Sequence, residues 1–338
     1  MIKSVTIDNN FGESMTIKLA DPVILDEIPE EVGPEMGIFI TEIEGLGPVK
    51  ADINMAEVAT QHGARYVSSR AESRDIIFHF LFLDINGVTA EDCRLQTYKY
   101  FPLGERVKLT IRTGQRTVVA YGYVESNEPE IFLEQVASTI TVSCPSSWFV
   151  LQQPNKTIDY TFSNLDAMFE FEFEDPVGES PSLIFSEIEH NKVHEITYAG
   201  EAETGMVITI TNVQRNFPAG VEWFTMPTIY DIETGEFMKI DTDVIEKTFN
   251  PSFDPSIVPK IYQTCVDSSS IVISTVTDNK YVRYIHTDGT TYNVLAALSL
   301  DSSWLKIHPG VNKFSYTCDH GDIDVDVNIK ATVLISGV

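Results

Sequence analysis

Two histidines and a run of carboxylates are the residues of this chain whose spacing could build a metal site. His190 and His194 are four residues apart, which on a helix puts two imidazoles on one face, as in some zinc sites. The flanking segments, Ile184-Phe185 and Ile196-Thr197-Tyr198, are rich in residues that favour strands. We therefore interpret the spacing as accidental and expect no zinc ligands here.

The carboxylates belong to a segment near the end of the chain in which polar and apolar residues alternate. Its polar members are His320, Asp322, Asp324 and Asp326, and its apolar members are Ile323, Val325 and Val327. Calcium can bind several carboxylates at once, but no glycine-bearing loop of the usual calcium-binding pattern is present. The period of two instead indicates a strand whose polar side faces water.

No pattern typical of a catalytic centre occurs. The sequence lacks the G-x-S-x-G nucleophile motif, the P-loop, the G-x-G-x-x-G dinucleotide loop and the H-E-x-x-H zinc motif. A carboxylate pair could support glycoside hydrolysis, but acidic residues are so abundant that no pair stands out. We predict that the chain is not an enzyme and needs no cofactor or metal; a cell-wall hydrolase is the alternative in that class.

The composition is that of a folded, acidic protein. The chain has 338 residues, 43% of them hydrophobic and 10% aromatic, which suffices for one large or two ordinary domains. The formal net charge is −27 and no cluster of Lys and Arg interrupts it, which argues against binding to nucleic acid. No run of about 18 apolar residues predicts a membrane span, and the first residues lack the pattern of a signal peptide. The four cysteines are far apart and form no C-x-x-C pair, so we expect them to be reduced and buried.

The best-defined block of secondary structure lies between residues 73 and 149. A near-continuous apolar run over 75–83 predicts a strand covered on both faces. Thr89 is placed to cap a short helix that ends near Tyr100. Alternation over 107–111 and 118–124 predicts a hairpin, and residues 137–142 are predicted to form a closing strand.

Residues 51–70 interrupt the first half of the chain, because they contain few large apolar residues and show weak periodicity. They follow a predicted hairpin over 1–23 and a predicted strand over 38–43. Long irregular segments inside compact domains are usually functional or disordered. Two interpretations stay open: a surface loop, or an extended arm that becomes ordered against a neighbouring subunit.

The second half contains many short strand candidates separated by turn residues, which is typical of a β-sandwich. The candidates lie at 169–173, 206–210, 271–274, 281–285, 314–316, 324–329 and 331–335. No convincing long helix is visible, and residues 292–298 could form at most a turn or two. Residues 151–156 read as a linker, so we predict two domains, 1–150 and 151–338. The predicted fold class is mainly β: an α+β first domain with a sandwich-like core and one short helix, followed by a β-sandwich.

A set of short motifs occurs in a fixed order across both halves. The first half has a strand led by Arg74, the V-x-L-x-I … Y-G-Y-V hairpin and the C-P-S-S-W-F segment that contains Trp148. The second half has four segments, at 199–212, 229–241, 267–282 and 302–329, whose motif residues are Gly200, Gly205, Gly235, Lys280, Trp304, Gly310 and Asn312. Together these motifs resemble the distal tail (Dit) proteins of siphophages that infect Gram-positive bacteria. Three positions depart from the family pattern: Tyr198, Glu201 and Ile307.

The resemblance implies a structural protein of the phage tail tip, assembled in the host cytoplasm and carried in the virion. It implies a ring of six copies, single or stacked, whose first domains surround a channel that DNA passes without specific binding. A belt-like excursion over about 42–68 would help to close the ring, and galectin-like or carbohydrate-binding-module-like sandwiches would project outward. The implied partners are the major tail tube protein and the tail-associated baseplate hub protein, with a receptor-binding protein or a host saccharide as further candidates and no membrane.

The motif residues also have a plain physical role, and we interpret them as determinants of the fold and not as a site. Thr-Gly pairs permit positive φ in tight hairpins, and Asn312 can cap its own turn. Trp304 is expected to anchor the core. The alternative function is a carbohydrate-binding module, with Trp223 as the candidate saccharide contact unless that side chain packs in the core.

Overall fold

The structure, a computed structural model, describes residues 2–19, 37–57, 62–85, 87–130, 136–152, 157–167, 186–188, 192–213, 223–257, 260–321 and 324–338. The strand predicted at 169–173 and His190 lie outside these residues. Contacts divide the chain into two units, Met1–Lys156 with Leu334–Val338, and Thr157–Val333. The boundary therefore falls a few residues beyond the predicted one, and the last five residues belong to the first unit.

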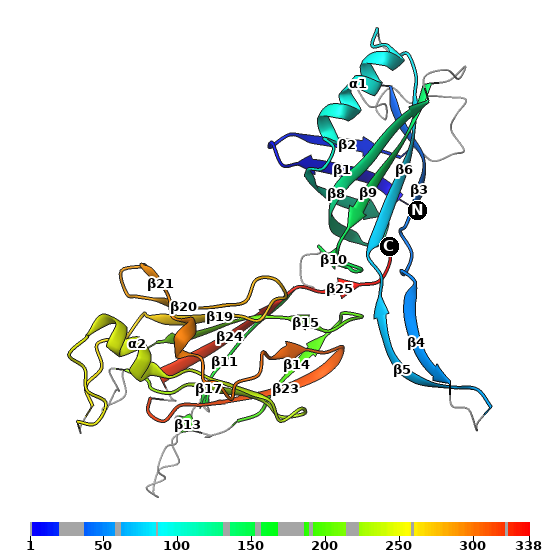
Figure 1. Ribbon diagram of the computed structural model, residues 1–338. Helices are drawn as coiled ribbons and strands as arrows, with labels where there is room; N and C mark the ends of the chain where they lie inside the picture. Colours follow the sequence, from blue (N-terminus) through cyan, green and yellow to red (C-terminus); the bar gives the residue numbers. More distant parts are fainter. Residues whose placement is uncertain are drawn as a thin grey trace, which may run out of the picture. The chain divides into compact units, whose positions relative to one another are not determined.

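The first unit is built on one antiparallel sheet in the order β2-β1-β7-β8-β9-β6-β3, to which β10 and β25 are added (Figure 1). Its strands are β1 (Ile2–Asn9), β2 (Ser14–Lys18), β3 (Ile38–Glu44), β6 (Arg74–Phe82), β7 (Arg106–Thr113), β8 (Thr117–Glu130), β9 (Val136–Cys144), β10 (Phe149–Leu151) and β25 (Leu334–Ile335). A separate pair, β4 (Ala51–Glu57) and β5 (Ala64–Ala71), also belongs to this unit. The prediction that the strand at 75–83 is covered on both faces is wrong, because alternate residues of β6 are exposed or half-buried.

Helix α1 (Ala90–Tyr100) begins at the predicted cap. Thr89 Oγ1 accepts a hydrogen bond from the Asp92 N–H at 3.1 Å, and the Asp92 carboxylate accepts one from the Thr89 N–H at 3.2 Å. This reciprocal pair is a capping box. Below the helix, Phe78, Phe80, Phe82 and Phe101 form an aromatic core with ring centroids 5.8 to 6.3 Å apart.

The second unit contains two main antiparallel sheets, in the orders β11-β24-β16-β19-β20-β21 and β14-β23-β17-β18. The first sheet comprises β11 (Ile158–Phe162), β16 (Val207–Asn212), β19 (Ser270–Ser274), β20 (Tyr281–Ile285), β21 (Thr291–Asn293) and β24 (Val325–Ala331). The second comprises β14 (His194–Tyr198), β17 (Thr228–Asp231), β18 (Phe237–Lys239) and β23 (Gly310–Thr317). Two short pairs complete it, β12 (Leu165–Ala167) with β13 (Ser186–Ile188) and β15 (Thr204–Gly205) with β22 (Lys306–Ile307). The ring of Phe162 lies 4.2 Å from His194 and 6.0 Å from Tyr316, so the two sheets share one aromatic core.

The second unit also contains a helix that the sequence did not lead us to predict. Helix α2 (Thr242–Phe249) follows Asp241, whose carboxylate accepts from the N–H groups of Asp243 and Val244. The capping residue was a visible signal, but eight residues are too few for a convincing helical period. A 3₁₀ turn, η2 (Leu295–Ala297), lies in the stretch where at most a turn or two was predicted. The fold is mainly β, as predicted, and no helix of the described residues is long and apolar enough to cross a membrane.

Candidate assembly surface

Strands β4 and β5 form a two-stranded ribbon, which we call the arm. Within the described part of the chain they pair with each other and with no other strand. Every residue of β5 is exposed, and so is all of β4 except Asp52, which is half-buried. A lone two-stranded hairpin is at best marginally stable in water, and its free edges present unpaired backbone groups. The arm therefore has the properties of an element that is completed by a partner.

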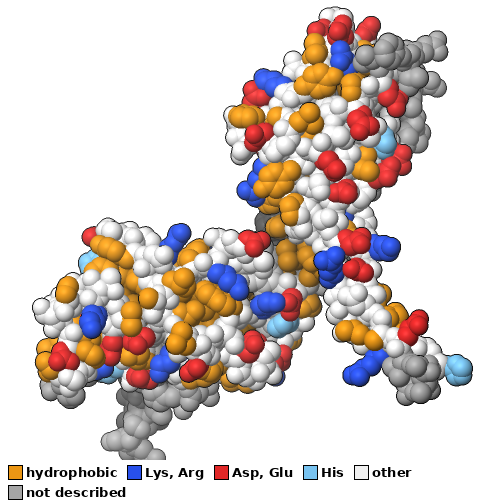
Figure 2. Space-filling view, in the orientation of Figure 1, with side chains coloured by type: hydrophobic (Ala, Val, Ile, Leu, Met, Phe, Trp, Pro, Cys, Tyr) orange, Lys and Arg blue, Asp and Glu red, His pale blue; other side chains and the backbone are white. Residues whose placement is uncertain are grey.

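Large apolar side chains on the arm reach the surface. The exposed fractions are 50% for Ile53, 60% for Met55, 59% for Tyr66 and 60% for Val67. Figure 2 shows hydrophobic side chains on this ribbon next to charged ones. Four such side chains on one short ribbon are more than scattered surface residues require.

The arm corrects two expectations from the sequence. The interpretation of residues 51–70 as a surface loop is wrong, because the segment forms two paired strands. The predicted excursion over about 42–68 begins too early and ends too soon. Residues 38–44 form β3, with Glu42 opposite His79 and Glu44 opposite Ile77, so the arm spans 51–71. Alternation in this segment was weak because neither face of the ribbon is buried.

Arg74 lies at the arm root, by which we mean residues 45–50 that lead into the arm and Glu72 that leads out. The side chain is 1% exposed. Its guanidinium donates to the backbone carbonyls of Gly45, Gly47, Ser147 and Ser336 at 2.5 to 3.3 Å. The ring of Phe149 lies 4.1 Å from its central carbon. The sequence singled out Arg74 as a motif residue, but it gave no signal for these four acceptors, which come from three distant segments.

Burial shifts the pKa values of the ionisable groups around Arg74. Removal from water lowers the pKa of the Arg74 guanidinium from its ordinary value, while four carbonyl oxygens replace the lost water. Burial also raises the pKa of the neighbouring Cys144 thiol to about 11, so the thiol is neutral at physiological pH. Arg74 is therefore a buried cation whose hydrogen-bond acceptors are all neutral backbone carbonyls.

The glycines and the asparagine among the motif residues of the second unit act on local geometry. Asn312 is 3% exposed; its Oδ1 accepts from the His308 N–H and its Nδ2 donates to the His308 carbonyl, both at 2.7 Å. This is the predicted cap of the turn. Gly235 and Gly310 have φ of +73° and +102°, which favours glycine. A Cβ at Gly205 would lie 2.4 Å from the Thr275 carbonyl oxygen.

Trp304 differs from the expectation of a core anchor. Trp304 is only half-buried, with Lys280 Nζ 5.1 Å from its ring, and the buried residue beside it is Leu305. Trp148 is likewise half-buried beside the fully buried Phe149. Both tryptophans are half-buried, because the next residue of the alternating pattern takes the core position.

Trp223, the candidate saccharide contact, is half-buried. Its ring lies 6.3 Å from Tyr262 and 6.1 Å from His320. The side chain is therefore neither fully packed in the core nor free of neighbours. Part of its ring faces solvent beside an imidazole and a phenol.

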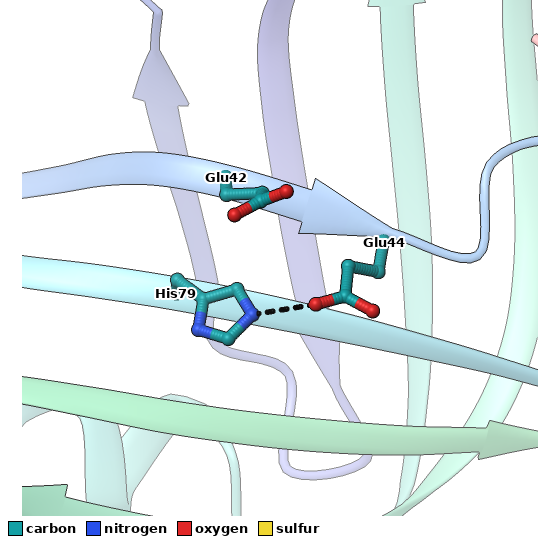
Figure 3. A group of neighbouring side chains, drawn as sticks. All are labelled: Glu42, Glu44 and His79. Carbon is teal, nitrogen blue, oxygen red and sulfur yellow. Dashed lines mark hydrogen bonds and ion pairs between the residues drawn. The ribbon is translucent and has the colours of Figure 1, made fainter.

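One group of the described residues offers three potential metal ligands within 4.8 Å of one another: Glu42, Glu44 and His79. Figure 3 shows the His79 ring joined to the Glu44 carboxylate, with Glu42 beside them. The Nε2–Oε1 distance is 3.1 Å, and Thr139 Oγ1 lies 3.3 Å from Nδ1. A β-bulge after Ile40 turns both carboxylates to the His79 side. Both glutamates are exposed, and the His79–Glu44 hydrogen bond accounts for the arrangement on a wet sheet face.

Of the histidine and aspartate sets considered from the sequence, the structure describes His194, His320, Asp324 and Asp326. His194 lies in β14 and stacks on Phe162, so the predicted strand context is confirmed. Asp324 was expected on a wet strand face but is 1% exposed and precedes β24. Its carbonyl accepts from the Val213 N–H at 2.8 Å, which draws this residue inward. Asp322 lies outside the described residues.

Comparison with known proteins identifies solved structures with a similar fold. No protein-family model matches the chain, and no curated protein matches its sequence. The crystal structure of the SPP1 Dit protein (gp 19.1), described as a paradigm of the hub adsorption apparatus in phages that infect Gram-positive bacteria, is similar with a TM-score of 0.57. That similarity covers 98% of both chains at 12% identity. The structure of the phage P2 baseplate in its activated conformation with Ca is similar with a TM-score of 0.48 at 11% identity, over 100% of both chains. At 12% identity the similarity to the SPP1 protein shows a shared fold, and it confirms the predicted resemblance at that level.

Proposed function

We propose that this chain, which has the Dit-like hub fold, is a structural protein of a phage tail tip. The observation that carries the proposal is the arm, an exposed two-stranded ribbon with free edges and four exposed apolar side chains. Such a surface serves assembly and not catalysis. A non-enzymatic role agrees with the fold, since the SPP1 protein that shares it is described as a hub.

The proposed assembly is a ring of six copies, as the resemblance implies. Each arm would add its edge to a neighbouring copy and bury the side chains of Ile53, Met55, Tyr66 and Val67. A head-to-tail contact of this kind is heterologous and closes into a ring when the rotation between neighbours divides a full turn. The ring would be single or stacked, and it would sit at the tail tip of the virion.

The proposed partners are the major tail tube protein on one side of the ring and the tail-associated baseplate hub protein on the other. A receptor-binding protein is a further candidate. The formal charge of −27 suits a channel through which DNA passes, because like charges disfavour binding of the phosphate backbone. No phosphate-gripping basic stripe is needed for that role.

Deletion of the arm tests the proposal. The Glu72 N–H donates to the Lys50 carbonyl at 3.2 Å, so an Asn-Gly turn can replace residues 51–71 without displacing the arm root. We expect the intact chain to form rings in electron microscopy and the shortened chain to be a folded monomer by light scattering and circular dichroism. A matched control replaces Ile257 and Ile261, exposed apolar residues outside the arm, with Ser and should keep the ring. Rings that survive deletion of the arm would contradict the proposal.

Saccharide binding by the second unit is a second candidate function. The supporting observation is that Trp223 keeps part of its ring exposed beside Tyr262 and His320, since aromatic rings that bind sugars must be accessible. The test is binding to host cell-wall glycans by the intact chain and by Trp223→Ala. Loss of binding with unchanged folding would support this function, and absence of binding by the intact chain would exclude it.

A further inference from the structure

The end of the chain returns to the first unit, although the preceding residues, Thr157–Val333, form the second. Strand β25 pairs with β10, with Phe149 opposite Ile335 and Val150 opposite Leu334. The second unit is thus inserted between two segments of the first. Its second connection, between Val333 and Leu334, leads into the five-residue segment Leu334–Val338.

That five-residue segment, which we call the strap, ends on the arm root. The Ser336 carbonyl accepts from Arg74 Nη2 at 2.6 Å. The Val338 N–H donates to the Leu46 carbonyl at 3.1 Å. A Cβ at Gly337 would lie 3.2 Å from that same Leu46 oxygen, so the two backbones are in close contact.

One guanidinium holds the strap and the arm root together. Arg74 Nη1 donates to Gly45 and Gly47 in the root, and Nη2 donates to Ser336 in the strap and to Ser147. Ser147 Oγ in turn donates to the Glu72 carbonyl at 2.7 Å, at the other side of the root. The segment that leads into the arm is therefore bonded directly to this buried cation, and Glu72, which leads out of it, is linked to the cation through Ser147.

We infer that the strap is a conformational device that holds the arm root in place and couples it to the second unit. A buried cation that loses an acceptor is destabilised more than a neutral donor, because water does not replace the lost bond. The strap therefore has two distinct arrangements, docked with Arg74 satisfied, and undocked with the root released. Tension on the second unit is delivered through the Val333–Leu334 connection to the Ser336–Arg74 bond, and from there to the arm. This inference does not depend on ring formation.

The test is a chain that ends at Ile335, which keeps β25 but removes the Ser336 acceptor and the Val338 donor. Limited trypsin digestion after Lys50, in the arm root, measures release of the root. We expect cleavage at Lys50 to accelerate about tenfold or more, since a tenfold change corresponds to ~1.4 kcal/mol of local stability. Cleavage after Lys280, in the second unit, is the internal control and should be unchanged. The two chains are compared at equal oligomeric state, which light scattering establishes.

A second variant tests whether the strap acts through Arg74. Arg74→Lys keeps the charge but cannot reach four carbonyls at once. If Arg74 is the coupling group, removal of residues 336–338 from the Arg74→Lys chain adds little further cleavage at Lys50, which is the non-additivity expected of one network. Unchanged cleavage in the shortened chain, or fully additive effects of the two changes, would overturn the inference. If Arg74→Lys does not fold, the rate of cleavage at Lys50 in the shortened chain tests the inference by itself.

Discussion

Replacement of Asn312 by Ala is the change whose cost the structure defines most sharply. The side chain makes two 2.7 Å hydrogen bonds to the backbone of His308 and a 3.2 Å bond to the Gly310 carbonyl. These bonds close the turn that opens β23, the strand between β14 and β17 in the four-stranded sheet. Asn312 is 3% exposed, so water cannot substitute at the side-chain end.

The expected loss of stability in Asn312→Ala follows from the backbone groups that it leaves without a hydrogen-bond partner. A buried donor or acceptor that loses its hydrogen bond costs about 1 to 3 kcal/mol. His308 is half-buried, which places each of its two groups at the low end of that range. With the loss at Gly310 added, we expect the free energy of unfolding of the second unit to fall by about 3 kcal/mol. For a unit of this size, about 2 to 4 °C per kcal/mol gives a decrease in Tm of about 6 to 12 °C.

Differential scanning calorimetry measures the change, because it resolves transitions of units that unfold separately. The matched control is Asn293→Ala, the same chemical change at an exposed residue that caps a single N–H group, that of Leu295, at 3.1 Å. We expect this control to cost about 0.5 kcal/mol or less. A Tm for Asn312→Ala no lower than that of Asn293→Ala would refute the reasoning that burial of the cap sets its value.

Three further predictions concern the glycine turns, the buried thiols and the pH dependence of stability. Gly205→Ala should abolish the cooperative thermal transition of the second unit, because the new Cβ would lie 2.4 Å from the Thr275 carbonyl oxygen. Gly235→Asn is the control and should change the Tm by less than about 2 °C. No atom lies within 4 Å of a Cβ built at Gly235, and Asn tolerates the positive φ of this position. Ellman's reagent at pH 8 should label one thiol, the half-buried Cys318, in the native chain and four in urea; labelling of more than one native thiol would contradict the burial of the other three. Burial raises the pKa of the Cys144 thiol to about 11. The contribution of the neutral thiol to the free energy of unfolding is therefore full below the ordinary thiol pKa and is lost as the pH rises toward 11. Denaturant titrations between pH 8 and 11 measure this loss.

Local patterns in the sequence predicted several of the elements that bury one face. Alternation predicted β7 within one or two residues of its ends, and the Thr89 cap fixed the start of α1. The same logic failed where burial is not periodic. The arm shows no alternation because it has no buried face, and α2 is too short to show a helical period against a background of strands.

The candidate site was only partly accessible from sequence. Arg74 was recognised as the head of a strand, but its role depends on Gly45, Gly47 and Ser336, whose backbone carbonyls carry no sequence signal. The half-buried position of Trp304 was not predicted either, because alternation does not say which of two neighbouring apolar residues faces the core. Leu305 takes that position in the structure.

The sequence by itself determined the mainly β class, the acidic character, the caps and glycine turns, and the order of the strands along the chain. Each of these depends on neighbours within a few residues or on composition alone. The tertiary structure decided the order of strands within each sheet, the separation of the arm from the sheet, the return of residues 334–338 to the first unit and the burial of Arg74 among four carbonyls. These features join residues up to 262 positions apart. Contacts over such distances arise from packing and backbone hydrogen bonding between segments, which local periodicity does not encode.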